Sequence, residues 1–373
     1  MAMHRRANQS EVKENFMNHR HLALSAAVLA MFAVVPLQAA EPLKVAFVFF
    51  GSVQDGAWTY SHDQGRLEME KALGSKVKTT HVENVPDGAD AERVIRKLAA
   101  EGNKLIIGAS FGYMNAIEKV ARIYPDVTFE HVTGTRRSRN VGTYATRDYE
   151  GVYLQGILAA RMTKSGVIGF VAPFPIPAVL ANINAFTLGA QSVDPKVRTR
   201  VMWVNTWYDP AREKLAAEAL ISQGADVLAN DTASPAVLQA AQEKGKYGFA
   251  RDADMSRFAP KSHLTATTNQ WGKFYTETAL AVMSGTWRSG DVRGGLKEGM
   301  VRMAPLNGVV PADAAKLFET RKAQMSAGKL NPFRGPIKDQ RGNLKVPAGV
   351  DMPLQEVLSM NYYVQGVEGA MPK

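Results

Sequence analysis

Residues 90–110 read DAERVIRKLAAEGNKLIIGAS, and residues 211–232 repeat the pattern as AREKLAAEALISQGADVLANDT. Each stretch has an amphipathic helical pattern, then a glycine, then a short apolar run that is typical of a buried strand. An offset of 122 residues places Gly102 on Gly224. The chain therefore contains the same structural unit twice.

The same offset aligns the segments that precede these two stretches. KVAFVFFG (44–51) lies on GVIGFVAPFP (166–175), and VENVPDGADAE (82–92) lies on VNTWYDPAREK (204–214). Consecutive units of strand and helix thus share one register. Two similar open α/β halves, each with loops at the carboxyl ends of its strands, predict a ligand-binding cleft between two domains.

Apolar runs rich in Val, Ile and Phe alternate with helical patterns along the chain, which is typical of buried parallel strands joined by helices. We expect strands near 44–50, 77–84, 104–109, 127–132, 166–172, 199–205, 226–230, 246–251 and 263–268. Helices are expected over 89–101, 210–223 and 311–327, the second with Asp209 as N-cap and Pro210 as first helical residue. The aromatic pair Tyr362 and Tyr363 is expected to pack onto a domain.

The chain has 373 residues, which is long enough for two domains with full cores. Residues 1–40 are interpreted as an N-terminal extension and signal peptide, starting at Met1 or Met17, with cleavage near Ala39 or Ala40. Lobe 1 is expected over 41–146, completed by about 265–300, and lobe 2 over 147–264, completed by about 301–373. The chain lacks cysteine and therefore the residue that anchors a lipoprotein, so we expect a soluble periplasmic protein.

The formal net charge of +10 raises the question of an anionic partner such as nucleic acid. The Lys and Arg residues are spread over predicted helix faces, and the one tight cluster, 136–139, lies in a connecting loop. Export also separates the protein from nucleic acid. We therefore expect no nucleic-acid partner.

An enzyme is the main alternative from another functional class. The run 108–112, GASFG, matches the G-x-S-x-G nucleophile elbow of hydrolases, with Ser110 as nucleophile. However, His131 and His263 both lie inside predicted strands, and the repeat places Thr232 at the position of Ser110. No glycine-rich phosphate loop and no metal-ligand spacing occurs in the sequence. We predict a protein that is not an enzyme and uses neither cofactor nor metal, and keep an exported esterase as the alternative.

The loops at the predicted strand ends combine aromatic and short polar side chains. Aromatic rings stack on flat ligands, whereas carboxylates and amides pair with N–H or O–H groups, so a small planar or polyhydroxylated ligand is indicated. Alternatively, single aromatic residues plug the interdomain hinge or cap a core, and the Asp residues are solvated loop charges. The predicted ligand-binding residues are Trp58, Tyr60, Phe111, Phe174, Trp207, Asn230, Asp231, Asp252, Asp254, Asn269 and Trp271.

Four segments carry a resemblance to a known family. The order of KVAFVFFGSVQDGAWTYSHDQG (44–65), GASFGYMN (108–115), NTWYDP (205–210) and LANDTASP (228–235), behind a signal peptide, resembles the basic-membrane-protein (BMP) family of solute-binding proteins of ABC importers. The resemblance implies the periplasmic-binding-protein type I fold, an α/β fold of two Rossmann-like lobes with parallel sheets around an interdomain cleft. It further implies delivery of a purine base or nucleoside to an ABC permease in the inner membrane. We expect the protein to be a monomer. A sensor subunit of the same fold is a further alternative.

The resemblance also assigns roles to individual residues. In the family two aromatic residues clamp the purine, and the matching residues here are Trp58 and either Trp207 or Phe174. The family's G-x-D-x-D run corresponds to residues 250–254, which makes Asp252 a ligand contact. Nucleoside-binding members carry a sugar-binding Asp after the first strand, where this chain has 49–51, FFG. Nucleoside-binding members also carry a lysine after the strand that corresponds to LTATT (264–268), whereas this chain has Thr268, Asn269, Gln270 and Trp271 there. These departures favour a free, adenine-like base, with a nucleoside or a sugar as alternatives.

Overall fold

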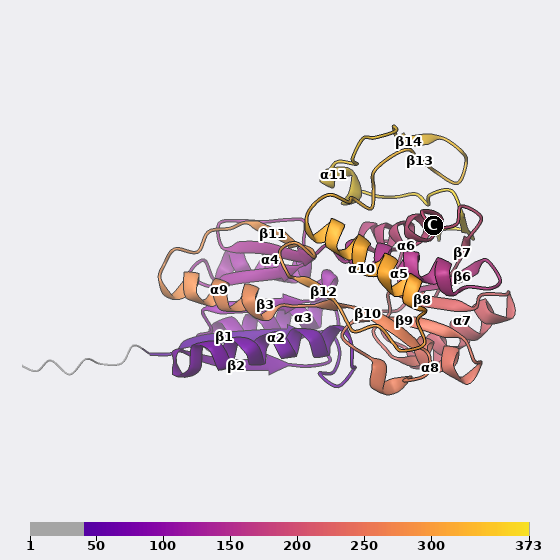
Figure 1. Ribbon diagram of the computed structural model, residues 1–373. Coiled ribbons are helices and arrows are strands. Elements are labelled where there is room, and N and C mark those ends of the chain that lie inside the picture. The colour runs from indigo at the N-terminus through magenta and orange to yellow at the C-terminus, as the bar shows by residue number, and fades with distance from the viewer. Residues whose placement is uncertain (1–40, 373) are drawn as a thin grey trace, which may run out of the picture. The chain divides into compact units, whose positions relative to one another are not determined.

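The computed structural model describes residues 41–372, whose helices and strands form two α/β lobes (Figure 1). The predicted signal peptide lies outside the described residues. Among the described helices, none is long and apolar enough to cross a membrane. Each lobe is built around one sheet, so the two sheets define lobe 1 and lobe 2.

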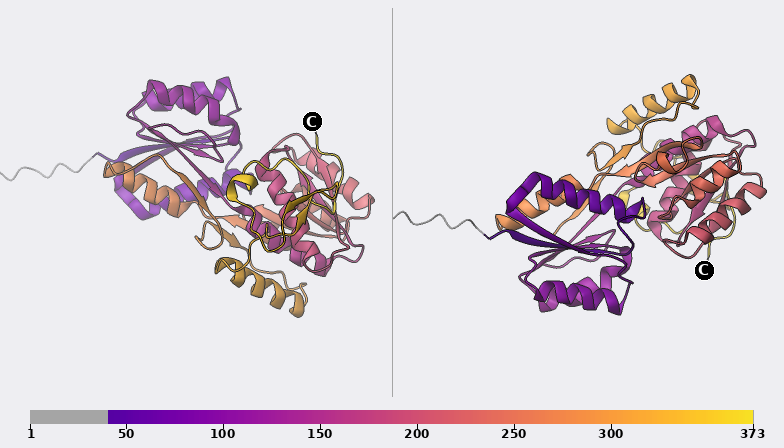
Figure 2. Two further views of the ribbon diagram at one scale, coloured as in Figure 1. Left: turned by 90° about the horizontal axis from the view of Figure 1, so that it is seen from above. Right: turned by 90° about the horizontal axis from the view of Figure 1, so that it is seen from below.

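The sheet of lobe 1 is parallel throughout, with strand order β11-β5-β4-β3-β1-β2. Helices α2 and α9 pack on one face, around Phe47 and Tyr275, and helices α3 and α4 pack on the other, around Ile106 and Ile117 (Figure 2). The strands are β1 (Leu43–Phe49), β2 (Val77–Val82), β3 (Leu105–Ala109), β4 (Thr128–Val132), β5 (Val141–Thr146) and β11 (Asp291–Gly294), and the helices are α2 (Trp58–Leu73), α3 (Ala89–Ala100), α4 (Met114–Ile123) and α9 (Gly272–Met283).

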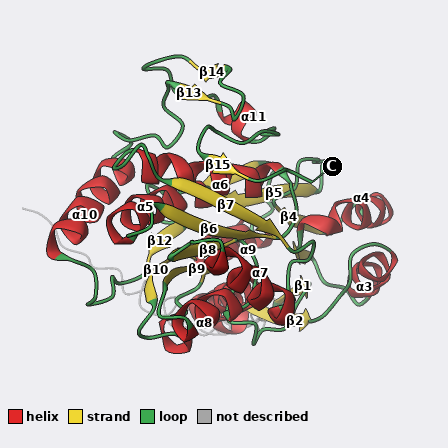
Figure 3. Cartoon of the chain, turned by 90° about the vertical axis from the view of Figure 1, so that its right-hand side faces the viewer, coloured by secondary structure: helices red, strands yellow, loops and turns green. Residues whose placement is uncertain are grey.

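The sheet of lobe 2 has the order β12-β10-β9-β8-β6-β7-β15, and its strands pair in parallel except for β12, which is antiparallel to β10. Helices α5, α6 and α10 cover one face, and α7 and α8 cover the other (Figure 3). The strands are β6 (Val167–Ala172), β7 (Arg198–Trp203), β8 (Val227–Asn230), β9 (Tyr247–Asp252), β10 (His263–Asn269), β12 (Val301–Met303) and β15 (Val367–Glu368), and the helices are α5 (Asp148–Met162), α6 (Pro177–Gln191), α7 (Pro210–Ser222), α8 (Ala236–Glu243) and α10 (Ala312–Ser326).

The predicted duplication is confirmed by the strand orders. Reading from β2, lobe 1 runs β2-β1-β3-β4-β5, and lobe 2 runs β7-β6-β8-β9-β10 in the same spatial order. Helix α3 corresponds to α7, whose predicted N-cap is also confirmed, since the Asp209 side chain accepts a hydrogen bond from the Arg212 N–H at 3.0 Å. The nine predicted strands correspond to β1–β4 and β6–β10, whereas β5 and the strands from β11 to β15 were not predicted.

The chain passes between the lobes at three lobe crossings: 146–148 between β5 and α5, 269–272 between β10 and α9, and 294–301 between β11 and β12. Each lobe is thus completed by a segment from the other half of the chain. Strand β10 belongs to the sheet of lobe 2. The numerical domain limits given above stay a prediction.

Helices α5 and α6 pack closely because glycines face backbone at their contact. A Cβ atom on Gly189 would clash with the carbonyl oxygen of Tyr153, and one on Gly156 would clash with that of Phe186. The axes approach more closely than side chains would allow. This pair of helices forms much of the lobe 2 core.

The C-terminal segment also packs onto lobe 2, as expected from its aromatic pair. It contains the hairpin β13 (Ile337–Lys338) and β14 (Leu344–Val346) and the short helix α11 (Leu354–Val357), before β15 extends the sheet beside β7. Tyr363 is buried and its hydroxyl accepts a hydrogen bond from Trp203 Nε1 at 3.0 Å. The tail therefore covers a sheet edge that would otherwise be open.

Candidate ligand-binding pocket

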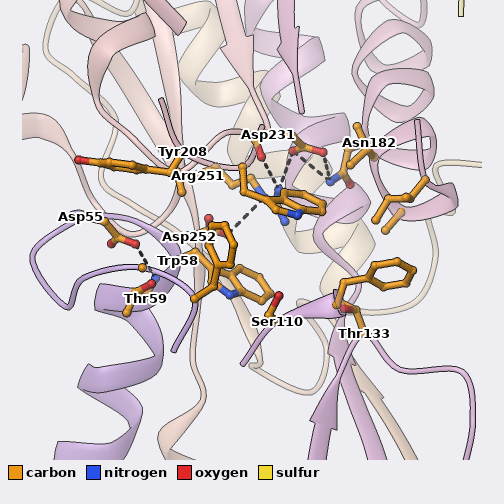
Figure 4. Close-up of a pocket in the computed structure, with 18 residues that line it drawn as sticks. Asp55, Trp58, Thr59, Ser110, Thr133, Asn182, Tyr208, Asp231, Arg251 and Asp252 are labelled. Atoms are coloured by element: carbon orange, nitrogen blue, oxygen red, sulfur yellow. Dashed lines mark hydrogen bonds and ion pairs between the residues drawn. The ribbon is translucent and has the colours of Figure 1, made fainter. Parts of the chain in front are cut away.

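A pocket is lined by side chains from both lobes at the carboxyl ends of their parallel strands (Figure 4). This is the position at which open α/β sheets bind ligands. Lobe 1 contributes Phe50, Gly51, Asp55, Trp58, Thr59, Ser110, Phe111 and Thr133, and lobe 2 contributes Ile176, Ala178, Val179, Asn182, Trp207, Tyr208, Asp231, Ala233, Arg251 and Asp252.

Trp58 forms the wall of lobe 1 and is held from two directions. Its Nε1 donates a hydrogen bond to the carbonyl oxygen of Ala109, at the end of β3, at 2.8 Å. The carboxylate of Asp55 accepts from the backbone N–H groups of Ala57, Thr59 and Tyr60 at 2.8 to 3.0 Å. These bonds satisfy the free donors at the start of α2 and thereby fix the backbone that carries Trp58.

A buried aromatic cluster supports Trp58 from behind. His62 stacks on Trp271 with ring centroids 4.5 Å apart and planes 9° apart. Its ring also packs against Trp58, with centroids 4.5 Å apart and planes at 69°. His62 Nδ1 lies 2.5 Å from the hydroxyl of Tyr275. Burial lowers the pKa of His62 to about 3, so the ring is neutral and serves packing.

The wall of lobe 2 is a cluster of three carboxylates around one guanidinium. Arg251 lies 2.9 Å from Asp148, 2.9 Å from Asp231 and 3.2 Å from Asp252. Asn182 donates a further hydrogen bond to Asp231 at 3.0 Å. Burial raises the pKa of Asp231 to about 6 and that of Asp252 to about 7, although the charge of Arg251 acts in the opposite direction. With three carboxylates around one guanidinium, the cluster has more acceptor than donor capacity at pH values above the pKa values of Asp231 and Asp252.

Arg251 also reaches the opposite wall. Its guanidinium carbon lies 6.0 Å from the ring centroid of Trp58, within the range of a cation–π contact. Together with Phe111 and Trp207, Trp58 gives the pocket flat apolar surfaces, and Asp231 and Asp252 give it hydrogen-bond acceptors. This combination suits a flat ligand that carries N–H or O–H donors.

The structure brings some of the predicted site residues together in this pocket, and these are Trp58, Phe111, Trp207, Asp231 and Asp252. A neighbouring cleft, which shares Asp252 with the pocket, is lined by Tyr60, Asp254, Asn269 and Trp271. Phe174 lies outside the pocket lining and packs against Trp207 with ring centroids 5.2 Å apart. Asn230 is buried, and its side chain donates to the carbonyl oxygen of Thr232.

Local structure explains why the other residues lie outside the pocket. Trp271 immediately precedes α9, so the second lobe crossing directs it into the core of lobe 1, where it is 1 % exposed. Asn269 donates to Asp252 Oδ1 at 3.1 Å, and the Asp254 carboxylate accepts from the backbone N–H of Ser256 at 2.9 Å. Trp271, Asn269 and Asp254 are therefore not part of the pocket lining.

Arg251 and Asn182 line the pocket but are absent from the predicted site. Arg251 stands beside Asp252 in the run that the family resemblance singles out, so the sequence carried a signal for it. Asn182 belongs to α6, whose residues are otherwise mostly apolar. A polar residue that is 3 % exposed in such a helix needs a hydrogen-bond partner, which here is Asp231.

The geometry around Ser110 differs from that of a hydrolase. Its hydroxyl donates to Asp87 Oδ1 at 3.0 Å, whereas His131 Nε2 lies 2.9 Å from the Ser110 backbone carbonyl oxygen. Burial lowers the pKa of His131 to about 4. A nucleophile needs its base within hydrogen-bond reach of the hydroxyl, and His131 contacts the backbone instead.

Two α/β lobes, joined by three lobe crossings and with a pocket at the carboxyl ends of their strands, define the periplasmic-binding-protein type I fold. A solved solute-binding protein of an ABC transporter system from Aeropyrum pernix has this fold, with a TM-score of 0.67 over 80 % of this chain and 93 % of its own, at 21 % sequence identity.

Residues 43–330 match the family model Bmp, described as ABC transporter substrate-binding protein PnrA-like, and the chain belongs to this family. It is 48 % identical over 335 residues to a purine-binding protein of Brucella abortus, covering 90 % of this chain and 95 % of the relative. It is also 33 % identical over 332 residues to a putative ABC transporter glucose-binding protein of Haloferax volcanii, covering 89 % and 82 %. The resemblance noted in the sequence is confirmed.

Proposed function

We propose that this protein captures a purine base, adenine or a close analogue, between its two lobes and delivers it to an ABC importer. The observation that carries the proposal is the pairing of the Trp58 ring with the acceptors Asp231 and Asp252 in one pocket. The 48 % identity to a purine-binding protein supports the same ligand class.

Two kinds of contact would recognise such a base: stacking on its ring faces and hydrogen bonds to its edge. An aromatic contact contributes about 1 kcal/mol beyond its buried area. Hydrogen bonds to a carboxylate contribute about 1.5 to 3 kcal/mol each, and the exocyclic amino group of adenine is a suitable donor. Phe50 and Gly51 line the pocket where nucleoside-binding family members carry a carboxylate for the sugar. This departure favours a free base over a nucleoside.

Closure of the lobes follows from the distribution of contacts. Trp58 and Phe111 belong to lobe 1, whereas Trp207, Asp231 and Asp252 belong to lobe 2. A ligand completes both sets only when the lobes are close, so its binding favours the closed state. We infer that a soluble periplasmic monomer, released from its signal peptide near Ala39 or Ala40 and without a lipid anchor, presents this closed form to the permease. We further infer that it performs no catalysis, since His131 is bonded away from the Ser110 hydroxyl.

A sugar is the second candidate ligand. The relative from Haloferax volcanii is described as a putative glucose-binding protein. Tryptophan faces and Asp side chains also suit the apolar faces and hydroxyl groups of a sugar.

Isothermal titration calorimetry against adenine, guanine, hypoxanthine, xanthine, their nucleosides and glucose tests the proposal. We expect adenine to bind with micromolar or tighter affinity and its nucleoside to bind at least tenfold more weakly. If glucose binds and no purine does, the proposed ligand is wrong but the role as a binding protein stands. Hydrolysis of a test ester that disappears in Ser110→Ala would instead support the enzyme.

A further inference from the structure

Two lobe crossings contact the polar wall of the pocket directly. Asp148 is the first residue of α5, and its Oδ2 accepts a hydrogen bond from Arg251 at 2.9 Å. Asn269 is the last residue of β10, and its Nδ2 donates to Asp252 Oδ1 at 3.1 Å. Arg251 and Asp252 line the pocket, whereas Asp148 and Asn269 lie behind it. Each pocket residue thus has one partner at a crossing.

The crossings are also bonded to one another. Arg147, next to Asp148, lies 2.6 Å from Glu150 and 2.6 Å from Glu298 of the third crossing. Glu150 accepts from the backbone N–H of Leu296 at 2.8 Å. The backbone N–H of Gln270, beside Asn269, donates to the carbonyl oxygen of Met300 at 2.9 Å. Short polar contacts thus link both the first and the second crossing to the third.

We propose that Asp148 and Asn269 are positioning residues, which hold the Arg251–Asp252 pair in its ligand-binding arrangement and couple binding to the lobe crossings. The inference rests on the proposed function. Both residues are buried, and Oδ1 of each has no hydrogen-bond partner within residues 41–372. The hydrogen bonds from Asp148 to Arg251 and from Asn269 to Asp252 are thus the main polar contacts of these two side chains. A buried polar group that loses its partner destabilises the fold.

The two residues have opposite expected effects on the protonation of Asp252. The charged groups that face Asp252 are Arg251 on the same strand, Asp148 on α5, Asp231 after β8 and Asp55 before α2, while Asn269 meets it from β10. Burial, followed by the neighbouring carboxylates, raises the pKa of Asp252, whereas Arg251 lowers it. Asp148→Asn removes a nearby negative charge and should lower this pKa. Asn269→Asp adds one and should raise it.

The experiment measures adenine affinity by calorimetry between pH 5 and pH 8.5 for the wild type and both variants. An ionised carboxylate accepts a hydrogen bond more strongly than a protonated one, so the wild type should bind more weakly as the pH falls through about 7. We expect the midpoint to move down by about one pH unit in Asp148→Asn and up by about one unit in Asn269→Asp. Affinity at pH 8 should fall about three- to tenfold in Asp148→Asn.

Asp254→Asn is the matched control, because Asp254 lies two residues after Asp252 but is exposed and outside the pocket lining. It should leave both affinity and midpoint unchanged. Wild-type affinities and midpoints in both variants would overturn the inference. Equal weakening without a shifted midpoint would show a merely structural role and overturn it too. A wild type that binds no purine at any pH would instead overturn the proposed function.

Discussion

Replacement of Trp58 by alanine removes the aromatic wall of lobe 1 without touching the bonds that start helix α2. Those bonds run from the Asp55 carboxylate to backbone N–H groups and do not depend on the indole ring. Trp58 is half-buried, and the cluster behind it is held together by His62, Trp271 and Tyr275. We therefore expect a folded protein with a weakened pocket.

The magnitude follows from what the ring contributes to a stacked base. Loss of the aromatic contact costs about 1 kcal/mol, and loss of the apolar area that the ring covers costs about 1 to 2 kcal/mol more. The sum of about 2 to 3 kcal/mol corresponds to an affinity about 30- to 150-fold lower. Trp58→Phe keeps a ring but loses the Nε1 bond to Ala109, so an affinity about fivefold lower is expected.

Calorimetry with adenine on both variants measures these losses, and thermal melting monitored by circular dichroism verifies the fold. Trp203→Phe is the matched control, because it removes an indole N–H bond, to Tyr363, outside the pocket. The reasoning is wrong if Trp58→Ala melts like the wild type and still binds adenine with wild-type affinity. A large drop in melting temperature would show instead that Trp58 is chiefly a core residue.

Three further predictions concern the rest of the molecule. Gly189→Ala should force α5 and α6 apart through its clash with Tyr153 and lower the free energy of unfolding by about 1 to 3 kcal/mol. Thermal melting should show a loss of several degrees, and an unchanged melting temperature would disprove the close contact. The pKa values of Asp231 and Asp252 are raised to about 6 and about 7 in the fold, so the stability they contribute is present at low pH and is lost as the pH rises through these values. The ligand-free protein should accordingly lose a few degrees of melting temperature between pH 5 and pH 8, and Asp252→Asn should flatten this dependence; a wild-type profile in that variant would count against the assignment. Ser110→Ala removes the bond to Asp87 and should change adenine affinity less than threefold, with no ester hydrolysis before or after the change; an activity lost with the hydroxyl would contradict the receptor.

The fold was predictable because most of its strands are buried on both faces. Such strands appear in the sequence as continuous apolar runs, as in β1 and β3. Strand β5 escaped because its sequence, VGTYAT, mixes small and polar residues. Gly142 is needed there, since a Cβ atom would lie 2.6 Å from the buried carboxylate of Glu130. The apolar pattern of the sequence reveals strands that bury large side chains. It does not reveal a strand such as β5, where side chains of neighbouring strands occupy the space beside a glycine.

The site was predictable only in part, for a related reason. Loop aromatics such as Trp58 and Trp207 stand out in sequence, because large rings directly after predicted strands lie where open α/β sheets bind ligands. The ion cluster does not stand out, since Arg251 meets Asp148 and Asp231 from elements far apart in the chain. Trp271 was placed at the cleft because it follows a strand, but the following helix belongs to the other lobe. Sequence position cannot reveal such a crossing.

The central claim is that a purine base binds between Trp58 and the carboxylates of lobe 2. A crystal structure of the mature protein grown with adenine tests it most directly. The account predicts the base stacked on the Trp58 ring, with its amino edge within hydrogen-bond distance of Asp231 or Asp252. A pocket occupied by a sugar, or a base bound elsewhere on the protein, would contradict it.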